Sequence, residues 1–491
     1  MGASAFQHWR SRLLSLRWRT ALLVIATLVV GGSIAILLLS HDPFGNHPAS
    51  GRHFVSHRHE HNHVSSATNS VAVVVKTGAT VALSGRLAAL LDTSLQAVDD
   101  PLIVSDLEQT IGRHRIHDVL ARFPQDMKET HADFELYRKQ QEYVATGNAK
   151  GLASLSDWPV VGKKGVDQNA AWALDRYKFA RMVELAIEAR PDRDWYIFIE
   201  DDTYLSYSAL SEFLADYDPS EPFFIGSPVR MPGIKGEPFF FGYGGSGFVL
   251  SRAVAKKWES HRYNLASRWD RTISDMWYGD FILAWVLKEE LGLRLTPAWP
   301  MLNNDEPARI PFGSGTWCKP AVTLHHMRAY LFDVIYQAEK GLRSDILRFR
   351  DVFHAANPDG LPAKRDDWTN YAEDRERHEM KPASQDVDLK APESAHNSFE
   401  SCQQACQEQK RCFTFSFVTD SPLPDFEHQA YGETECHLSD VFRSGHEFKP
   451  RTVQYDDKAT NTTILYQRQW ASGWMTTRID DFIEKHRYCG Q

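Results

Sequence analysis

The amino-acid sequence predicts an α/β protein with a mostly parallel sheet, followed by a small disulfide-rich C-terminal module. Two apolar runs that read as buried strands, 71–75 (VAVVV) and 195–199 (WYIFI), lie in the first half of the chain. The second run follows an amphipathic helical pattern at 170–189, and a helix leading into a buried strand is the order of a βαβ unit. The module is indicated by four cysteines that fall within 402–436.

Length and composition limit the classes of protein to consider. The 491 residues are too many for one ordinary domain and suggest two or three. The formal net charge of −9 comes from acids and bases mixed along most of the chain, so we expect no nucleic-acid partner, which would need a basic face. Hydrophobic residues make up 43% and aromatic residues 12%, which is enough for a well-packed core and excludes wholesale disorder.

The first 70 residues predict attachment to a membrane. Residues 21–39 contain no charged side chain, are long enough to cross the apolar core of a bilayer, and follow four arginines. By the positive-inside rule we expect a cytosolic tail at 1–20, an uncleaved transmembrane signal anchor at 21–39 and a lumenal remainder. A cleaved signal peptide is the alternative. The polar segment 40–70 is expected to be a stem.

Three consecutive acids, Glu200, Asp201 and Asp202, end the apolar run at 195–199. Burying a carboxylate is costly unless the group is paired or bound to a metal. Mg²⁺ and Mn²⁺ prefer oxygen ligands and are commonly held by one or two carboxylates together with substrate phosphates. We therefore predict a divalent cation that holds a phosphate at this strand end. A solvated acidic loop is the alternative.

Two other positions read as ligand contacts. Lys76, Thr77 and Gly78 follow the first predicted strand, at the end where α/β sheets place ligands, although the spacing is not that of a P-loop. Asp175 and Lys178 lie three residues apart and share one face of the predicted helix. They could form a surface ion pair or contact a nucleotide at the mouth of the sheet.

A glycine-rich segment lies at 239–252 (FFFGYGGSGFVLSR). Gly242, Gly244, Gly245 and Gly247 allow the backbone to approach a ligand closely. The aromatic residues around them suit a wall that packs against sugar rings. A glycine-rich β-hairpin is the alternative interpretation.

Two later segments carry candidate residues. Asp280 falls in the first turn of an apolar helical pattern at 275–287, where it could cap the helix or act as a catalytic base. The strand-like segment 320–327 ends in His325 and His326, which could be structural or could bind the same cation as the acids.

All six cysteines follow the expected anchor, on the oxidising side of the membrane, where an even number indicates disulfides. Three pairings are possible among Cys402, Cys406, Cys412 and Cys436. We favour Cys406–Cys412 inside Cys402–Cys436, with zinc binding as the alternative, and Cys489 is the remaining candidate partner of Cys318. The predicted boundaries are an α/β domain at 71–345, a linker at 346–398, the module at 399–474 and a C-terminal tail at 475–491.

The order of these motifs resembles glycosyltransferase family 31, the Fringe and β-1,3-galactosyltransferase group. The resemblance covers about 71–336, is closest to the core 1 galactosyltransferase-like and fungal branches, and rests on VVVKTGAT, ALDRYKF, YIFIEDDTY, FGYGGSGFVLSR, YGDFILA and TLHHM. Residues 399–436 are similar to a PAN/Apple module, a carbohydrate- or protein-binding fold. The family resemblance implies a GT-A fold, a Rossmann-like sheet that binds a UDP-sugar and Mn²⁺ or Mg²⁺.

The resemblance also implies roles for single residues. Those expected to line the nucleotide and donor sugar are Lys76, Thr77, Gly78, Asp106, Asp175, Lys178 and Asp201, with Gly244 and Gly245 shaping the donor and acceptor pocket. The implied metal ligands are Glu200, Asp202 and His325, with His326 as a one-residue ambiguity. Glu200 departs from the family's pattern, because Glu replaces the first Asp of the metal-binding DxD motif. Asp280 falls at the position of the catalytic base.

The implied reaction is a single displacement with inversion at the sugar. A carboxylate takes the proton from the acceptor hydroxyl, while the metal neutralises charge on the leaving diphosphate. The resemblance thus implies a type II Golgi membrane enzyme that transfers a hexose, expected to be galactose, in β-1,3 linkage to a glycan or glycoprotein acceptor. A non-catalytic membrane protein that binds glycans through its PAN/Apple-like module is the alternative. An aspartyl phosphatase is disfavoured, because Glu-Asp-Asp-Thr lacks the D-x-D-x-T spacing.

Overall fold

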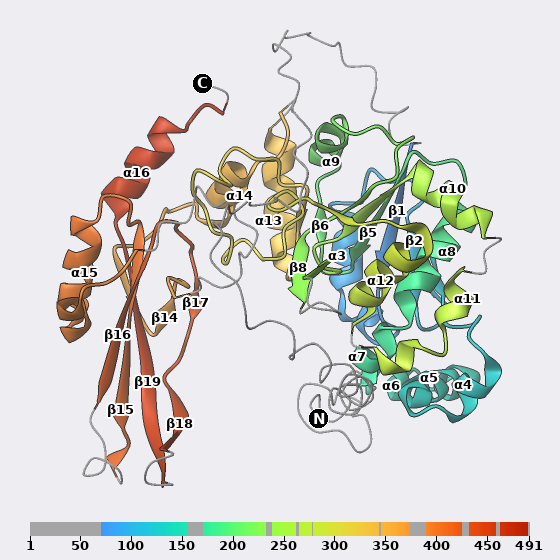
Figure 1. The fold of residues 1–491 in the computed structure, drawn as a ribbon, viewed down its shortest axis with the longest axis horizontal. Coiled ribbons are helices and arrows are strands. Elements are labelled where there is room, and N and C mark those ends of the chain that lie inside the picture. The colour runs from blue at the N-terminus through green and yellow to red at the C-terminus, as the bar shows by residue number, and fades with distance from the viewer. Residues whose placement is uncertain are drawn as a thin grey trace, which may run out of the picture.

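The computed structural model describes residues 70–155, 170–231, 238–261, 265–276, 278–342, 345–373, 389–424, 432–457 and 462–489. The predicted tail and transmembrane segment, and all but the last residue of the stem, lie outside these ranges. Among the helices of the described ranges, none combines the length and the apolar character needed to cross a bilayer. Figure 1 shows an α/β lobe around a central sheet, and beside it a second lobe built mainly of long strands.

The central sheet of the α/β lobe has eight strands, and β1 and β5 lie in its middle. The β-branched run of β1 and the aromatic and β-branched run of β5 are buried on both faces, as expected for central strands. In sheet order the strands are β11 (Leu295–Pro297), β7 (Phe224–Gly226), β10 (Phe248–Ser251), β5 (Trp195–Glu200), β1 (Val71–Lys76), β2 (Leu102–Ser105), β4 (His114–Asp118) and β3 (Gln109–Ile111).

Strand direction in this sheet is mixed. The pairs β5–β1, β1–β2, β2–β4 and β11–β7 are parallel, whereas β10 runs antiparallel to both β5 and β7. Phe248 at the start of β10 pairs with Phe198 near the end of β5. Because the two strands run in opposite directions, the residues just before Phe248 lie beside the residues just after Phe198. The reversed strand therefore brings the glycine-rich segment next to the three acids.

Alternate residues of the central strands point to opposite faces and enter two separate cores. Val74 and Phe198 belong to the first core, and Val73 and Ile197 to the second. The first core takes side chains from α4 (Gln125–Thr130), α5 (Glu135–Ala145), α6 (Ala149–Ala153), α7 (Ala170–Asp175), α8 (Lys178–Ala189), α10 (Arg252–Ser260), α11 (Leu265–Trp269) and α12 (Gly279–Leu291). The second takes them from α3 (Arg86–Asp92), α9 (Tyr207–Leu214), α13 (Ala329–Gly341), α14 (Phe349–Ala356) and α16 (Thr476–Lys485).

The helix predicted at 170–189 is two helices, α7 and α8, separated at Arg176 and Tyr177. Tyr177 is fully buried and donates a hydrogen bond from its hydroxyl to Asp133 Oδ2 at 2.8 Å. The amphipathic pattern does not continue through this break, and Trp172 of α7 is 56% exposed. The helix predicted at 275–287 begins at Gly279, because 273–275 form the separate 3₁₀ helix η6 (Ile273–Asp275).

Short elements complete the α/β lobe and its junction with the second lobe. The two-stranded pairs are β6 (Tyr204–Leu205) with β12 (Thr323–Leu324), β8 (Pro228–Met231) with β9 (Phe239–Gly242), and β14 (Trp368–Thr369) with β17 (His446–Glu447). The other 3₁₀ helices are η2 (Val81–Ser84), η3 (Ala132–Phe134) and η8 (Glu393–Asn397).

The second lobe contains an antiparallel sheet, the helix α15 (Phe399–Glu408) and, after the last strand, α16. Its strands are β13 (Lys364–Asp366), β15 (Thr414–Pro422), β16 (Glu433–Ser439), β18 (Arg451–Asp457) and β19 (Thr462–Trp474). The disulfides Cys402–Cys436 and Cys406–Cys412 tie α15 to the region of β15 and β16. This nested pairing confirms the prediction. We call residues 364–489 the C-terminal lobe.

The structure corrects the predicted linker at 346–398 and tail at 475–491. The linker contains α14, whose Phe349, Val352 and Phe353 are buried in the second core, and β13, which joins the sheet of the C-terminal lobe. The tail forms α16, whose Ile479 and Phe482 enter the same core. In these segments a few apolar side chains lie among many charged residues, so the sequence pattern did not reveal α14, β13 and α16.

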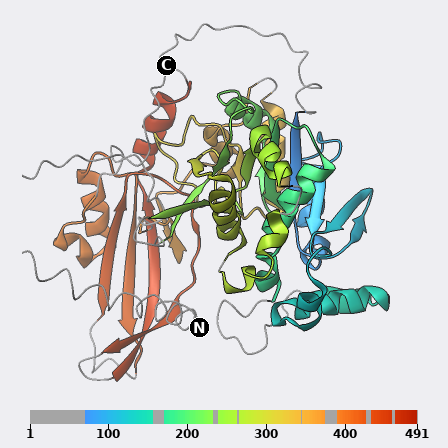
Figure 2. The same cartoon turned by 45° about the vertical axis from the view of Figure 1, so that its right-hand side comes forward.

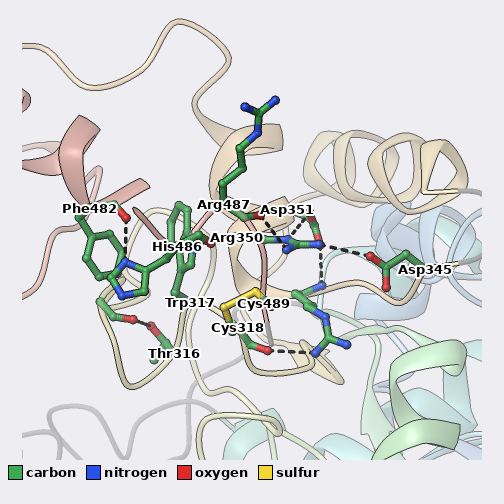
Figure 3. Close-up of a disulfide and its surroundings, with 12 residues drawn as sticks. Thr316, Trp317, Cys318, Asp345, Arg350, Asp351, Phe482, His486, Arg487 and Cys489 are labelled. Atoms are coloured by element: carbon green, nitrogen blue, oxygen red, sulfur yellow. Dashed lines mark hydrogen bonds and ion pairs between the residues drawn. A yellow bond between two sulfur atoms is a disulfide. The ribbon is translucent and has the colours of Figure 1, made fainter. Parts of the chain in front are cut away.

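The two lobes share one core and one covalent bond. Phe312 of the α/β lobe exchanges backbone hydrogen bonds with Phe442 of the C-terminal lobe, and Trp317 packs against Phe482 of α16. Cys318 is bonded to Cys489, the remaining candidate partner, and Figure 3 shows this disulfide beside Trp317 and His486. In both views of the fold the C-terminal lobe stands against the α13–α14 side of the α/β lobe (Figure 1, Figure 2).

Candidate active site

The predicted site residues meet at the carboxyl ends of β1, β2 and β5. Lys76, the last residue of β1, is the register partner of Glu200 in β5 and of Val104 in β2. Because these three strands are parallel and in register, the turns that follow them lie along one edge of the sheet. Asp106 and the acids 200–202 are brought to this edge.

Two buried lysines hold a network of acids at this edge. Lys76 Nζ donates to both carboxylate oxygens of Asp175, at 2.6 and 2.7 Å, and lies 3.2 Å from Glu200 Oε1. Burial alone would lower the pKa of Lys76, but the charges of Asp175 and Glu200 outweigh it and raise the pKa. Asp175 and Lys178, predicted to contact a nucleotide, thus face the sheet edge, and Asp175 keeps part of its side chain exposed.

Lys178 Nζ makes the second half of the network. It donates to the backbone oxygen of Thr77 at 3.0 Å and lies 3.2 Å from Asp106 Oδ1. Asp106 also accepts from the backbone nitrogen of Ala79 at 2.9 Å and from Gln140 Nε2 at 2.9 Å. Burial alone would raise the pKa of Asp106, but the charge of Lys178 and these hydrogen bonds lower it. Asp106 therefore holds the Thr77–Gly78 turn in place while it stays ionised.

Asp202, His325 and His326 form a group that could hold a metal ion. Each offers a ligand atom, and these atoms all lie within 4.8 Å of one another. Asp202 Oδ1 is 3.2 Å from His325 Nε2. Among the residues that the structure describes, Asp202 Oδ1 and His325 Nδ1 are buried polar atoms without a hydrogen-bond partner. Buried polar atoms without partners are rare, and one carboxylate with two imidazoles is a donor set that suits a divalent cation.

Asp202 and His326 are in the forms that favour cation binding, whereas the contact with Asp202 raises the pKa of His325 against the effect of burial, so His325 must lose a proton when a metal binds. Burial alone would raise the pKa of Asp202, but its contact with His325 and the charge of Arg86 hold the pKa at about 2. Burial and the charge of His325 lower the pKa of His326 to about 4. At neutral pH, Asp202 is therefore an anion and His326 is neutral, which are the forms that bind metals.

The two other acids of the predicted metal motif have different partners. Glu200 pairs with Lys76 and is not part of the group around Asp202, so the structure does not bring it to the cation site as predicted. Asp201 is almost fully buried and accepts a hydrogen bond from Thr77 Oγ1 at 2.5 Å. Burial raises the pKa of Asp201 to about 6, although Arg86 and Thr77 act in the opposite direction.

Arg86 is a site residue that the sequence reasoning missed. Its Nη2 lies 3.0 Å from Asp201 Oδ1, and its Nη1 lies 3.3 Å from Asp202 Oδ2. Arg86 is the first residue of α3, after Gly85 and η2, and this position near the end of β1 was the signal available in the sequence. A guanidinium bound to both carboxylates offers a fixed positive charge beside the expected phosphates.

Asp280, at the start of α12, accepts hydrogen bonds from two backbone nitrogens. Its Oδ1 accepts from the backbone nitrogen of Phe281 at 2.8 Å, inside the first turn of α12, and its Oδ2 accepts from that of Gly244 at 2.9 Å. Burial raises the pKa of Asp280 to about 6, with a smaller contribution from the charge of Glu200. A carboxylate with such a pKa is ionised at neutral pH yet can accept a proton, as a general base must.

Gly244 and Gly245 are required by close packing. A Cβ on Gly245 would lie 2.2 Å from His325 Cε1, and one on Gly244 would lie 2.9 Å from Phe179 Cζ. The hairpin interpretation of this segment is wrong, since β9 pairs with β8 while β10 pairs with β5 and β7. The glycines instead fill the narrow space between the metal-binding group and Asp280.

Comparison with known proteins gives a family match for the part of the chain that contains most of this site. Residues 132–303 match the Fringe-like family. The predicted resemblance to the Fringe group is confirmed for this segment, which includes Asp175, Lys178, the acids 200–202, Gly244, Gly245 and Asp280. Lys76, Asp106 and His325 lie outside it. The resemblances to the fungal branch and to a PAN/Apple module stay predictions.

The similar curated proteins are named as β-1,3-N-acetylglucosaminyltransferases. Lunatic fringe of Danio rerio is 25% identical over 154 residues, which are 28% of this chain and 40% of that protein. Radical fringe of Notophthalmus viridescens is 30% identical over 131 residues, 24% of this chain and 32% of that protein. Lunatic fringe of Homo sapiens is 34% identical over 92 residues, 16% of this chain and 24% of that protein. The chain thus spans less than half the length of each of these relatives.

Proposed function

We propose that this protein is a metal-dependent, inverting glycosyltransferase that forms a β-1,3 linkage between a sugar from a UDP-sugar donor and a glycan or glycoprotein acceptor. The observation that carries the proposal is the placement of the group Asp202, His325 and His326 on one side of Gly244 and Gly245, with the half-buried Asp280 on the other. This small space therefore contains residues that could hold a cation beside the leaving diphosphate and a carboxylate that could take the proton of the acceptor hydroxyl. The β-1,3 linkage is proposed because the similar fringe proteins are named as β-1,3-N-acetylglucosaminyltransferases.

The cation site is proposed for Mn²⁺, because imidazole nitrogens suit it better than they suit Mg²⁺, which favours oxygen ligands. When bound, the cation would neutralise the diphosphate of the donor. Arg86 adds positive charge beside Asp201 and Asp202. Glu200 serves to hold Lys76, which in turn orients Asp175 toward the donor.

Asp280 is proposed as the base that activates the acceptor. Its carboxylate takes the proton of the acceptor hydroxyl as that oxygen forms a bond to the anomeric carbon. The bond from this carbon to the diphosphate oxygen breaks in the same step, which inverts the configuration. The hydrogen bonds from the backbone nitrogens of Gly244 and Phe281 hold the carboxylate in one orientation, so its position need not change before the reaction.

The donor sugar and the compartment are part of the proposal. The motif order supports galactose, whereas the names of the relatives support N-acetylglucosamine, and we propose UDP-galactose as the first donor to test. A lumenal Golgi location with a type II anchor at 21–39 is supported by the three disulfides, since such bonds persist in oxidising compartments.

The test is release of UDP by the purified full-length chain in detergent. UDP-galactose, UDP-N-acetylglucosamine and UDP-glucose are each supplied with a panel of glycan acceptors, with Mn²⁺ or with EDTA. We expect Mn²⁺-dependent UDP release and a product whose new linkage is β-1,3 by NMR. Absence of UDP release from every donor, with the protein folded by circular dichroism, would contradict the proposal.

A further inference from the structure

The loop 303–309 connects the metal-binding group with the C-terminal lobe. At its start, the backbone nitrogen of Asn303 donates to the backbone oxygen of Thr323 at 3.3 Å and to its Oγ1 at 3.1 Å. Thr323 lies in β12, two residues before His325. Asn304 accepts at Oδ1 from Ser227 Oγ at 2.6 Å, at the end of β7. This end of the loop is therefore attached to the floor of the candidate active site.

The other end of the loop is held by the C-terminal lobe. The backbone nitrogen of Gly445 donates to the oxygen of Ala308 at 2.9 Å, and Arg443 Nε donates to the oxygen of Arg309 at 3.0 Å. His446 Nε2 lies 2.8 Å from Glu306 Oε1. The C-terminal lobe therefore holds this end of the loop through both backbone and side-chain contacts.

An aromatic residue of the C-terminal lobe adjoins the same loop. The guanidinium of Arg309 lies over the ring of Tyr371, 4.6 Å from its centroid, and the rings of Tyr371 and His446 are 6.0 Å apart. Arg443 Nη1 also donates to the backbone oxygen of Tyr371 at 3.1 Å. Tyr371 is therefore held firmly by both lobes.

Hydrogen bonds join the loop to the candidate active site. The backbone nitrogen of Tyr243 donates to the backbone oxygen of Ser227 at 2.8 Å, and Ser227 Oγ donates to Asn304 Oδ1 of the loop at 2.6 Å. The ring of Tyr243 is 5.5 Å from that of His325. Because the backbone nitrogen of Gly244, next to Tyr243, donates to Asp280 Oδ2, a series of contacts runs from the proposed base through Tyr243 and Ser227 to the loop 303–309.

Backbone strain is found on both sides of the loop. His326 and Tyr371 both have a φ of +56°, in the left-handed region that side chains other than glycine rarely adopt. Such a conformation costs on the order of 1 kcal/mol or more and is found most often at active sites and ligand clamps. Here one strained residue, His326, belongs to the metal-binding group, and the other, Tyr371, lies beside the loop in the C-terminal lobe.

We propose that the loop 303–309 and the C-terminal lobe form an acceptor subsite for the sugar ring next to the one that reacts, with Tyr371, Arg309 and Glu306 as its contacts. The inference rests on the proposed function. An aromatic surface packs on the C–H face of a sugar, and a carboxylate and a guanidinium bind its hydroxyl groups. His446 is a positioning residue, because it acts through Glu306. The C-terminal lobe is then part of the enzyme's acceptor specificity.

The test compares p-nitrophenyl monosaccharides with the corresponding disaccharides as acceptors of the full-length enzyme in detergent, using the wild type and the variants His446→Ala and Tyr371→Asn. Asparagine is chosen because it tolerates a left-handed backbone. We expect the wild type to have the lower KM for a disaccharide. In both variants this KM should rise about fivefold or more, which corresponds to about 1 kcal/mol, while the KM for the UDP-sugar stays close to that of the wild type.

The matched control is His437→Ala, because His437 forms an equivalent ion pair with Glu435, at 2.9 Å, on β16 of the same lobe. We expect this variant to keep the wild-type disaccharide preference. The subsite is wrong if the wild type shows no such preference, if both variants keep it, or if they raise the KM for donor and acceptor together. Absence of any Mn²⁺-dependent UDP release from the wild type would instead overturn the proposed function itself.

Discussion

Asp202 Oδ1, just after the end of β5, lies 3.2 Å from His325 Nε2, just after the end of β12. The two strands belong to different sheets, so the main sheet does not bring these residues together. The short pairing of β12 with β6 does, because Leu324 is the register partner of Tyr204, two residues after Asp202. The candidate cation site therefore depends on this small antiparallel pair.

Loss of either ligand should abolish cation binding. We expect Asp202→Asn and His325→Ala each to lower activity by about 100-fold or more, since changes in residues that only support metal ligands already cost roughly 10- to 100-fold. Mn²⁺ affinity, measured by electron paramagnetic resonance, should fall in parallel. Glu200→Gln is the control, because Glu200 pairs with Lys76, and it should keep wild-type Mn²⁺ affinity. If Glu200→Gln lost as much Mn²⁺ affinity as Asp202→Asn, the assignment of Glu200 would be reversed.

Gly245→Ala should damage the same site through packing alone. The added Cβ would lie 2.2 Å from His325 Cε1, whereas ordinary contacts begin at 3.4 Å, so the ring must move by more than about 1 Å. A displacement of this size can cost about 100-fold in rate. Gly341→Ala is a matched control, because nothing lies within 4 Å of its Cβ. Wild-type Mn²⁺ affinity in the Gly245→Ala variant would show that the ring is not a ligand.

The activity should depend on the ionisation of Asp280. Burial raises its pKa to about 6, and a general base works only when ionised. kcat/KM should therefore be lost as the pH falls through about 6 and level off above it. Asp280→Asn should lower kcat by about 10²- to 10⁴-fold. Asp275→Asn, which changes the exposed acid of the preceding 3₁₀ helix, should leave the rate and its pH profile as in the wild type. A profile without a step near pH 6 would argue against Asp280 as the base.

The disulfides should differ in their effect on stability. Cys318–Cys489 closes a loop with a sequence separation of 171, whereas that of Cys406–Cys412 is 6. Loop entropy alone predicts losses of about 5 kcal/mol and about 2 kcal/mol when the bonds are removed. The double variant Cys318→Ser with Cys489→Ser should therefore unfold at a lower temperature than Cys406→Ser with Cys412→Ser, as followed by circular dichroism. Equal melting temperatures would mean that the shared core, and not the covalent bond, holds the lobes together.

Strands and their ends were predictable because local pattern determines them. The runs VAVVV and WYIFI have no polar residue that could face water, so they had to be central strands. The ends of these two strands then indicated Lys76 and Glu200 as candidate site residues. The nested cysteine pairing was the favoured one of three that the sequence left open, and the structure confirms it. Helix boundaries were harder to predict. The break at Tyr177, for example, depends on its hydrogen bond to Asp133, which is far away in the sequence.

The sequence by itself determined the α/β class, the strand ends that carry charge and the cysteine-rich module, because apolar periodicity and residue type act locally. Only the tertiary structure decided which charges meet: Glu200 with Lys76, Arg86 with Asp201 and Asp202, and Glu306 with His446. It also decided that α14 and α16 belong to one core with the sheet. The physical reason is that electrostatic interactions in a buried site depend on distances of a few ångströms between residues far apart in the chain.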